Sequence, residues 1–456
     1  MRLKKPKDKL RTFIFSVMVA ILIMNPIYFY IVSDPYRFYT DDEVFIHDDN
    51  FSYNIIATRT TNEYSFQKTQ LNTGVFDAAS NTTFVVYSSG INWHQSANSP
   101  YIIYFNHTTQ TWSPEKEIIK SPVKPDSHNY PTLLIDAEGY LHVFHSFHGN
   151  HEILHAKSIN PRDINDWEIS YIEGTEKATY GAAYQASNGD FYILARITHE
   201  HEHEPEYVIK STDQGQTWTI NCIIDPAPVI DYWGTIYTKG IKYESNPEGL
   251  HITFGVHQYH NLYMNKHYHV FYSFQDNHLY GVNGQDYGTT LEGSELGGNL
   301  LFFDLGGTTV FYNVRIGLDL HEDGRPHIFW REKDTPMGEI MRWASWNGTA
   351  WSEFGGQEME YVNPFSANYT GNDIFALTVI KGSRRVYHIE YNTSSNEILN
   401  QSLILQTINT KGRRFSHVLF IEQACPEILG LIIDGPNTPW ENPIPVGKMI
   451  TYGIKH

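Results

Sequence analysis

The sequence is poor in cysteine and in charged residues. Its 456 residues include only two cysteines, Cys222 and Cys425. A disulfide framework is therefore excluded, and we expect two free thiols rather than one bridge. Charged residues make up 18% of the chain, too few for a coiled coil or a long helical array. Lys and Arg number 33 against 51 Asp and Glu, for a net charge of −18. That balance argues against a general nucleic-acid binder, and an anionic ligand would need a locally basic cleft.

Convincing amphipathic helices are also missing from residue 51 onward. Short alternating apolar runs, separated by Gly, Asn, Asp and Pro turns, are found instead, a pattern typical of strands. Apolar residues (41%) and aromatic residues (14%, mostly Tyr and Phe) suffice for a sizeable core and favour β-structure.

The N-terminus resembles a targeting segment. An apolar run begins at Phe13 and extends to about Val32, long enough to span a bilayer as a helix. A flank of basic residues precedes it, which places the rest of the chain on the far side of the membrane. We divide the chain into a basic cytoplasmic segment (1–12), a transmembrane signal anchor or cleaved signal peptide (13–33), a linker (34–44) and one β domain (45–456).

Seven sequons agree with passage through a secretory pathway, provided that the host glycosylates its proteins. They begin at Asn50, Asn81, Asn106, Asn347, Asn368, Asn392 and Asn400. We therefore expect a membrane-anchored glycoprotein that faces the extracytoplasmic side, or a secreted protein.

The β domain is built from a repeated unit. The segment from His128 to Trp167 contains three extended runs and closes at a Trp, and the next segment repeats this order and closes at Trp218. The step between the two tryptophans is 51 residues. Units of 40–60 residues with four short strands are typical of a β-propeller, and about seven blades fit between residues 45 and 456. We predict an all-β propeller that follows one N-terminal helix.

One segment has a specific local motif. Residues 211–218, Ser-Thr-Asp-Gln-Gly-Gln-Thr-Trp, match the Asp-box pattern S-x-D-x-G-x-T-W. Asp213 can accept amide hydrogen bonds within the turn, Gly215 can adopt a positive φ, and Trp218 can pack between strands. The motif predicts a structural hairpin rather than a catalytic site.

Histidine is abundant, with 23 residues. Most histidines near strand ends are packed core residues, but several that converge on a propeller axis could act together. The run of residues 198–204, Thr-His-Glu-His-Glu-His-Glu, would place His199, His201 and His203 on one side of an extended chain. A structural divalent metal could bind there, although we favour a solvated loop between two outer strands. His257 and His260 end a further strand and are candidate substrate contacts or metal ligands.

The segment from Asp126 to Ser158 resembles the BNR-repeat, or Asp-box, family of propellers, which includes the ulvan lyases of polysaccharide lyase families 24 and 25. The resemblance rests on Asp-Ser-His-Asn-Tyr-Pro at residues 126–131, Asp-Ala-Glu-Gly-Tyr-Leu-His at residues 136–142, His148-Gly149 and Lys157-Ser158. It implies β-elimination in an anionic, uronate-containing glycan of the sulfated, ulvan type. We expect no required cofactor, no nucleic-acid partner and a monomer.

The resemblance also implies a set of catalytic residues. Members of the family use two His, a Tyr and an Arg near the channel mouth, and the matching positions are His128, His148, Tyr180 and Arg196. A further Tyr falls at Tyr237, with Tyr243 as a second choice that could bind substrate. An imidazole or a phenol beside a cation can transfer protons, and a guanidinium suits a carboxylate. Each residue alone could also be structural, through core packing for the tyrosines or an ion pair for Arg196.

Two other functions fit an Asp-box propeller. A sialidase needs three Arg, a Tyr–Glu pair and usually an early Arg-Ile-Pro segment, which this sequence lacks. A noncatalytic glycan-binding propeller on the cell surface would bind a glycan without releasing an unsaturated product.

Overall fold

The computed structural model contains strands and two short 3-10 helices in the residues that it describes. Those residues are 45–46, 58–60, 72–89, 99–123, 130–198, 203–227, 234–258, 266–304, 316–335, 338–355, 362–381, 385–407, 417–420, 428–436 and 447–455. Within them no helix is long and apolar enough to cross a membrane. The apolar segment 13–33 lies outside the described residues.

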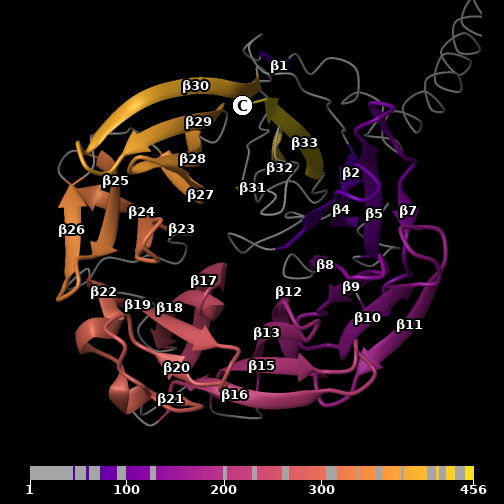
Figure 1. Ribbon diagram of the computed structural model, residues 1–456, viewed down its shortest axis with the longest axis horizontal. Helices are drawn as coiled ribbons and strands as arrows, with labels where there is room; N and C mark the ends of the chain where they lie inside the picture. The colour runs from indigo at the N-terminus through magenta and orange to yellow at the C-terminus, as the bar shows by residue number, and fades with distance from the viewer. Residues whose placement is uncertain are drawn as a thin grey trace, which may run out of the picture.

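The described strands form seven sheets that stand around a ring, in chain order from indigo to yellow (Figure 1). The first two sheets are four-stranded meanders, and a short strand β7 also pairs with β5. Their strands are β3 (Gly74–Asp77), β4 (Thr82–Ser89), β5 (Ser99–Asn106), β6 (Thr111–Trp112) and β7 (Lys116–Glu117), then β8 (Pro131–Ile135), β9 (Leu141–His145), β10 (Ile153–Ser158) and β11 (Trp167–Ile172).

The next two sheets each include a short strand from a neighbouring part of the chain, β21 in the third sheet and β14 in the fourth. The third contains β12 (Ala178–Gln185), β13 (Phe191–Ile197), β15 (Glu206–Ser211), β16 (Thr219–Asp225) and β21 (Leu291–Glu292). The fourth contains β14 (His203–Glu204), β17 (Gly234–Ser245), β18 (Glu248–Gln258), β19 (Lys266–Ser273), β20 (Leu279–Tyr280) and β22 (Leu301–Asp304). The 3-10 helices η1 (Gly293–Glu295) and η2 (Gly298–Leu300) precede β22.

The last sheets join the two ends of the chain. The fifth contains β23 (Ile316–Leu320), β24 (Pro326–Thr335), β25 (Gly338–Trp346) and β26 (Trp351–Gly355). The sixth contains β27 (Val362–Gly371), β28 (Ile374–Lys381), β29 (Arg385–Asn392), β30 (Glu397–Thr407) and the N-terminal β1 (Phe45–Ile46). The seventh contains β31 (His417–Phe420), β32 (Ile428–Pro436), β33 (Gly447–Lys455) and the N-terminal β2 (Thr58–Thr60). Strands from the start of the chain thus cover edges that the C-terminal sheets would otherwise expose.

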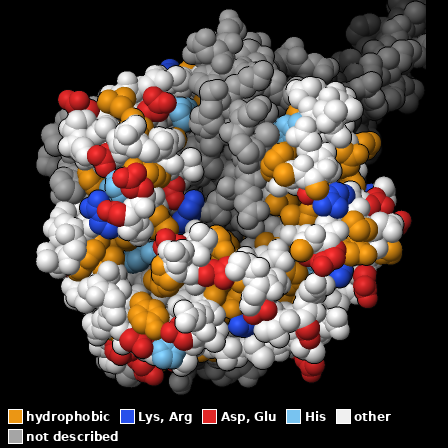
Figure 2. Space-filling view, in the orientation of Figure 1, with side chains coloured by type: hydrophobic (Ala, Val, Ile, Leu, Met, Phe, Trp, Pro, Cys, Tyr) orange, Lys and Arg blue, Asp and Glu red, His pale blue; other side chains and the backbone are white. Residues whose placement is uncertain are grey.

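The apolar core lies between neighbouring sheets. Val75 and Phe84 of the first sheet pack with Leu133 and Val143 of the second, and similar clusters fill further seams. This arrangement follows from strands that are apolar on both faces, such as β8, whose first four residues are all buried. Acidic and basic side chains are interspersed around the outer surface (Figure 2). The predicted all-β propeller is confirmed.

The Asp-box hairpin has the predicted geometry. Asp213 accepts hydrogen bonds from the amides of Gln216 and Thr217 at 3.0 and 2.8 Å. Gly215 has a φ of +87°, which favours glycine. The Trp218 ring packs edge-on against His155 of the preceding sheet, with ring centroids 5.9 Å apart. The motif therefore fastens the β15–β16 hairpin to the neighbouring sheet.

Candidate active site

The predicted site residues come from strand ends that meet at one end of the sheets. Tyr180 lies near the start of β12, and Arg196 lies near the end of its antiparallel partner β13. Tyr237 and His257 occupy the matching ends of β17 and β18 in the next sheet. Antiparallel pairing brings the start of one strand beside the end of the next, so these side chains share one region.

Arg196 is the centre of the cluster. Its guanidinium carbon lies 4.8 Å from the ring centroid of Tyr180 and 4.8 Å from that of Tyr237. Arg196 is only 4% exposed, so both cation–π contacts form away from bulk water and are stronger than on a surface. Arg196 contacts two aromatic rings as well as the Glu204 carboxylate, so its surroundings differ from those of a simple ion pair.

The charge of Arg196 is retained despite its burial. Burial alone disfavours the guanidinium cation, but Tyr180, Glu204 and Tyr237 together keep the pKa of Arg196 above its ordinary value. The Arg196 Nη1 atom lies 3.3 Å from Glu204 Oε2. Neither Nε nor Nη1 makes an aligned hydrogen bond to a described residue. Arg196 therefore keeps N–H donors with which a carboxylate could pair.

The backbone at Tyr180 has an uncommon shape. Tyr180 has a φ of +60°, in the left-handed region that non-glycine residues rarely occupy. The pairing of β12 with β13 shifts register between Thr179 and Ala182, and the Gly181 amide donates to Ser146 Oγ at 3.3 Å. This bulge re-aims the Tyr180 side chain relative to a regular strand.

Two imidazoles flank the tyrosines. The His148 ring lies 6.3 Å from that of Tyr180, and His148 also has a left-handed backbone, with a φ of +50°. The His257 ring contacts Tyr237 edge-on at 6.0 Å. Burial, Lys239 and Arg196 lower the pKa of His257, and Glu204 opposes them only in part. His257 is therefore a neutral imidazole at neutral pH.

Three further residues of the cluster were not predicted as members. The Tyr130 ring stacks 6.1 Å from that of Tyr180. The Lys239 ammonium lies 5.1 Å from the Tyr237 ring, and Glu204 pairs with Arg196. A signal for Lys239 was present in the sequence, because residues two apart on a strand share a face and Lys239 follows Tyr237 by two positions.

Other predicted site residues lie elsewhere. Tyr243 does not join the cluster: it is six residues from Tyr237 on β17, roughly 20 Å along the strand, and its hydroxyl donates to Glu248 at 2.6 Å. His128, His260, His199 and His201 fall outside the described residues.

The described end of the His-Glu run corrects one expectation. His203 and Glu204 form β14, which pairs in parallel with β17, so they are not part of a solvated loop between outer strands. His203 Nδ1 accepts from the Gly234 amide at 3.2 Å. Among the described residues no group of three His, Cys, Asp or Glu is placed to hold a metal ion. Cys222 is a free thiol, and Cys425 lies outside the described part of the chain.

Many other histidines pack in the seams. His142 forms hydrogen bonds with both Asp136 and His155. Its Nε2 lies 3.2 Å from Asp136 Oδ2, and its Nδ1 lies 2.9 Å from His155 Nε2. His251 connects Glu244 Oε2 at 2.8 Å and His269 Nε2 at 3.0 Å in the same way. These buried chains of two imidazoles and one carboxylate explain part of the high histidine content.

The Arg196 cluster contains a guanidinium, which can pair with an anion, and phenols and imidazoles, which can transfer protons. Its members are Arg196, Tyr180, Tyr237, His148, His257, Tyr130, Lys239 and Glu204. Its two cations, Arg196 and Lys239, supply the locally basic site that an anionic ligand needs in an acidic protein.

Curated relatives match part of the chain. An ulvan lyase of Alteromonas sp. (strain LOR) is 31% identical over 152 residues, 28% of this chain and 30% of the relative. The "Ulvan Lyase-PL25" of Pseudoalteromonas sp. (strain PLSV) is 32% identical over 151 residues, with the same shares. The matches thus span less than a third of the length of these relatives.

A solved structure is similar in fold to most of this chain. It is described as a polysaccharide lyase PL25 ulvan lyase bound to -[GlcA(1-4)Rha3S]-, and it superposes with a TM-score of 0.68 at 18% identity. The superposition covers 87% of this chain and 96% of that structure. The model of the BNR repeat-containing family matches residues 52–357, more than half of the sequence. The chain therefore belongs to the BNR repeat-containing family.

Proposed function

We propose that the protein is a polysaccharide lyase that cleaves a uronate-containing, anionic glycan of the ulvan type by β-elimination. The observation that carries the proposal is the buried Arg196, held between Tyr180 and Tyr237 with an imidazole beside each phenol. The names of the curated relatives support the same reaction class, although they match only part of this chain.

In this mechanism Arg196 binds the uronate carboxylate. Its guanidinium pairs with the carboxylate oxygens, and Lys239 adds positive charge nearby. Withdrawal of charge from the carboxylate makes the C5 proton more acidic and stabilises the enolate-like transition state. Because Arg196 is buried, this stabilisation acts in a low-dielectric surrounding, where it is stronger than in water.

Proton transfer then completes the elimination. A base takes the C5 proton, the C4–O4 bond breaks as the C4–C5 double bond forms, and an acid protonates the leaving O4. His148 and Tyr180 share these roles in the proposed mechanism, with His128 as a further candidate base. His257, which is neutral at neutral pH, contacts the substrate on the Tyr237 side.

The proposal includes the setting of the enzyme. Each of the seven sheets is one blade of the propeller. Residues 13–33 anchor the chain or act as a signal peptide, and the basic residues before them keep the N-terminus cytoplasmic. The propeller then acts as a monomeric glycoprotein outside the cytoplasm.

The test compares two tyrosines of one strand. Ulvan and other uronate-containing polysaccharides are incubated with purified protein, and unsaturated product is followed by ultraviolet absorbance. Arg196→Ala should lower kcat/KM by on the order of 10²- to 10³-fold, the usual cost of an electrostatic stabiliser. Tyr237→Phe should also lower it, whereas Tyr243→Phe, the matched control at the far end of β17, should not.

Three results would contradict the proposal. Wild type that binds one of these glycans but releases no unsaturated product is a glycan-binding propeller. Release of sialic acid from a sialoglycan would assign it to the sialidases. Equal losses in Tyr237→Phe and Tyr243→Phe would mean that the Arg196 cluster is structural.

A further inference from the structure

A cavity away from the Arg196 cluster lies between the sheet of β17–β20 and the sheet of β23–β26. Its volume is about 710 Å³, within the range of small-molecule sites. Acidic, basic, imidazole and aromatic side chains all line it, among them Glu244, His251, Asp276, Tyr280, Arg325 and Trp346. None of these residues belongs to the Arg196 cluster.

The cavity lies at the opposite end of the sheet from the Arg196 cluster. Strand β17 carries Tyr237 near its start and Glu244 near its end. Seven residues of extended strand separate the two side chains by roughly 23 Å. The cavity is therefore a separate site, and its role does not depend on lyase activity.

A comparison within the chain shows that this cavity is more than a structural seam. The chain Asp136–His142–His155 in the second sheet has the same connections as Glu244–His251–His269. The Asp136 and His142 side chains are 1% and 0% exposed, and Gly215 and Trp218 of the Asp box lie against His155 at the other end of this chain. The Glu244 and His251 side chains are 16% and 8% exposed and line the cavity.

The Glu244–His251–His269 chain contains polar atoms with which a ligand in the cavity could form hydrogen bonds. His251 Nε2 donates to Glu244 Oε2 and fixes the carboxylate, while Glu244 Oε1 makes no hydrogen bond to a described residue. His251 Nδ1 then accepts from His269 Nε2. His269 is fully buried, lines the cavity, and leaves its Nδ1 without a hydrogen-bond partner in the described part of the chain. Such atoms are costly to bury unsatisfied.

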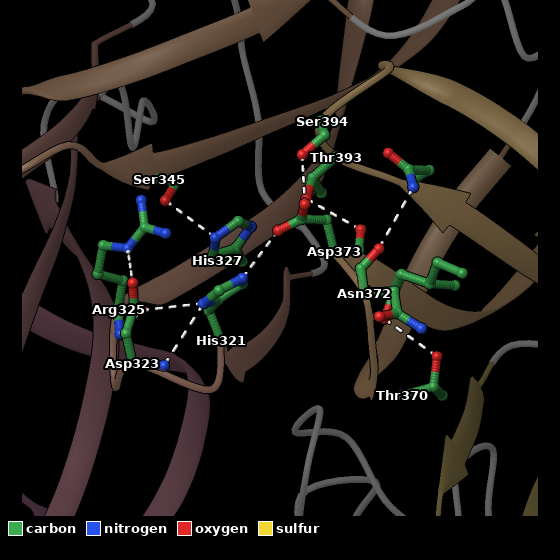
Figure 3. Close-up of polar contacts among 12 residues, drawn as sticks. His321, Asp323, Arg325, His327, Ser345, Thr370, Asn372, Asp373, Thr393 and Ser394 are labelled. Carbon is green, nitrogen blue, oxygen red and sulfur yellow. Dashed lines mark hydrogen bonds and ion pairs between the residues drawn. The ribbon is translucent and has the colours of Figure 1, made fainter.

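The opposite wall is held in place by the cluster in Figure 3. Arg325 Nε donates to Asp323 Oδ2 at 2.5 Å, and the Arg325 side chain is 41% exposed. His321 lies between Asp323 at 3.0 Å and Asp373 of the next sheet at 2.8 Å. The turn that carries Arg325 into the cavity lining is therefore held by contacts from the fifth and sixth sheets.

The charges of the cavity select the chemistry of its ligand. Four carboxylates line the cavity and repel an anion, those of Glu244, Asp276, Glu322 and Asp323, and Asp323 pairs with Arg325. Asp276 already accepts from the Tyr280 hydroxyl at 2.6 Å, a neutral donor like the hydroxyl of a sugar. Saccharide hydroxyls both donate and accept, and aromatic rings such as those of Tyr280 and Trp346, which line the cavity, can pack on the apolar face of a pyranose. We propose that this cavity binds an uncharged saccharide unit.

The test measures binding without any cleavage. Neutral oligosaccharides of xylose, glucose and rhamnose are titrated into the protein by calorimetry, with spermidine and glucuronate as charged comparators. At least one neutral sugar should bind wild type and Arg196→Ala equally. Glu244→Gln and Asp276→Asn should each weaken that binding about tenfold. Asp286→Asn is the matched control, because Asp286 lies in the same segment but pairs with His278.

Thermal unfolding of each variant confirms that it is folded. Because Asp276 is exposed, Asp276→Asn still tests the proposal if Glu244→Gln is destabilised. The proposal is overturned if no neutral sugar binds, if a charged comparator binds more tightly, or if neither substitution weakens binding. It is also overturned if Arg196→Ala abolishes binding, which would place the sugar at the Arg196 cluster.

Discussion

Arg196 combines three properties that no other basic side chain could supply together. It remains charged when buried, it stacks on two aromatic rings at once, and its planar fork still offers donors to a carboxylate. Glu204, whose Oε1 accepts from Thr198 Oγ1 at 3.0 Å, holds the guanidinium from a third side. The position therefore depends on guanidinium geometry and not only on positive charge.

This argument predicts the result of a charge-conserving substitution. Arg196→Lys should lower kcat/KM on uronate-containing glycans by on the order of 10²-fold, because an ammonium cannot stack on both rings and pair bidentately. Initial rates of ultraviolet absorbance check the expectation. Arg162→Lys is the control, since Arg162 forms an ion pair with Asp77 away from the cluster. Full activity of Arg196→Lys would show that charge alone suffices.

At the scale of elements, short irregularities position the site. The bulge in β12 and the left-handed residues His148 and Tyr180 turn two side chains toward the Arg196 cluster. A hairpin motif acts in the opposite way, because the Asp box makes a turn rigid and carries Trp218 into a seam.

The Asp box allows a prediction about stability. Hydrogen bonds from Thr217 lower the pKa of Asp213 to about 2, so the carboxylate is charged and strongly bound within the turn. Asp213→Ala should lower the thermal midpoint by a few degrees, measured by circular dichroism, and Asp213→Asn should lower it less because its amide oxygen still accepts. Lyase activity at low temperature should be unchanged in both variants. An unchanged midpoint in Asp213→Ala would mean that Trp218 packing alone fixes the hairpin.

At the scale of the whole molecule, the seams hold neutral histidines that make stability depend on pH. Burial lowers the pKa of His155, His267 and His327 to about 3, from an ordinary value of 6.5. The unfolded chain therefore binds more protons than the folded one between pH 6.5 and 3. Stability is complete above pH 6.5 and falls as the pH drops through that window.

His267 gives the sharpest test of this dependence. It is fully buried, and neither ring nitrogen has a hydrogen-bond partner among the described residues. At pH 5 the His267 imidazole is protonated in the unfolded chain but neutral in the folded one. This difference lowers the free energy of unfolding by about 2 kcal/mol. His267→Leu should therefore raise the thermal midpoint at pH 5 more than at pH 7.5. An equal change at both pH values would contradict the neutral, buried state.

Part of this structure could be predicted from the sequence. The repeated β unit between His128 and Trp218 was expected, and strands such as β10 and β13 form there, because apolar alternation and flanking turns are local signals. The convergence of Tyr180, Arg196 and Tyr237 was expected only through the resemblance to a family. The separation of Tyr243, the pairing of β14 with β17 and the contribution of Lys239 were missed, since each depends on contacts between distant segments.

The sequence alone determined the strands, the turns and the repeated unit, because alternation, glycine at positive φ and side-chain hydrogen bonds act within a few residues. Only the tertiary structure decided which polar residues meet. Whether one carboxylate–imidazole chain is fully buried and another opens to a cavity depends on how neighbouring sheets pack. Packing between sheets is a long-range property that local patterns do not encode.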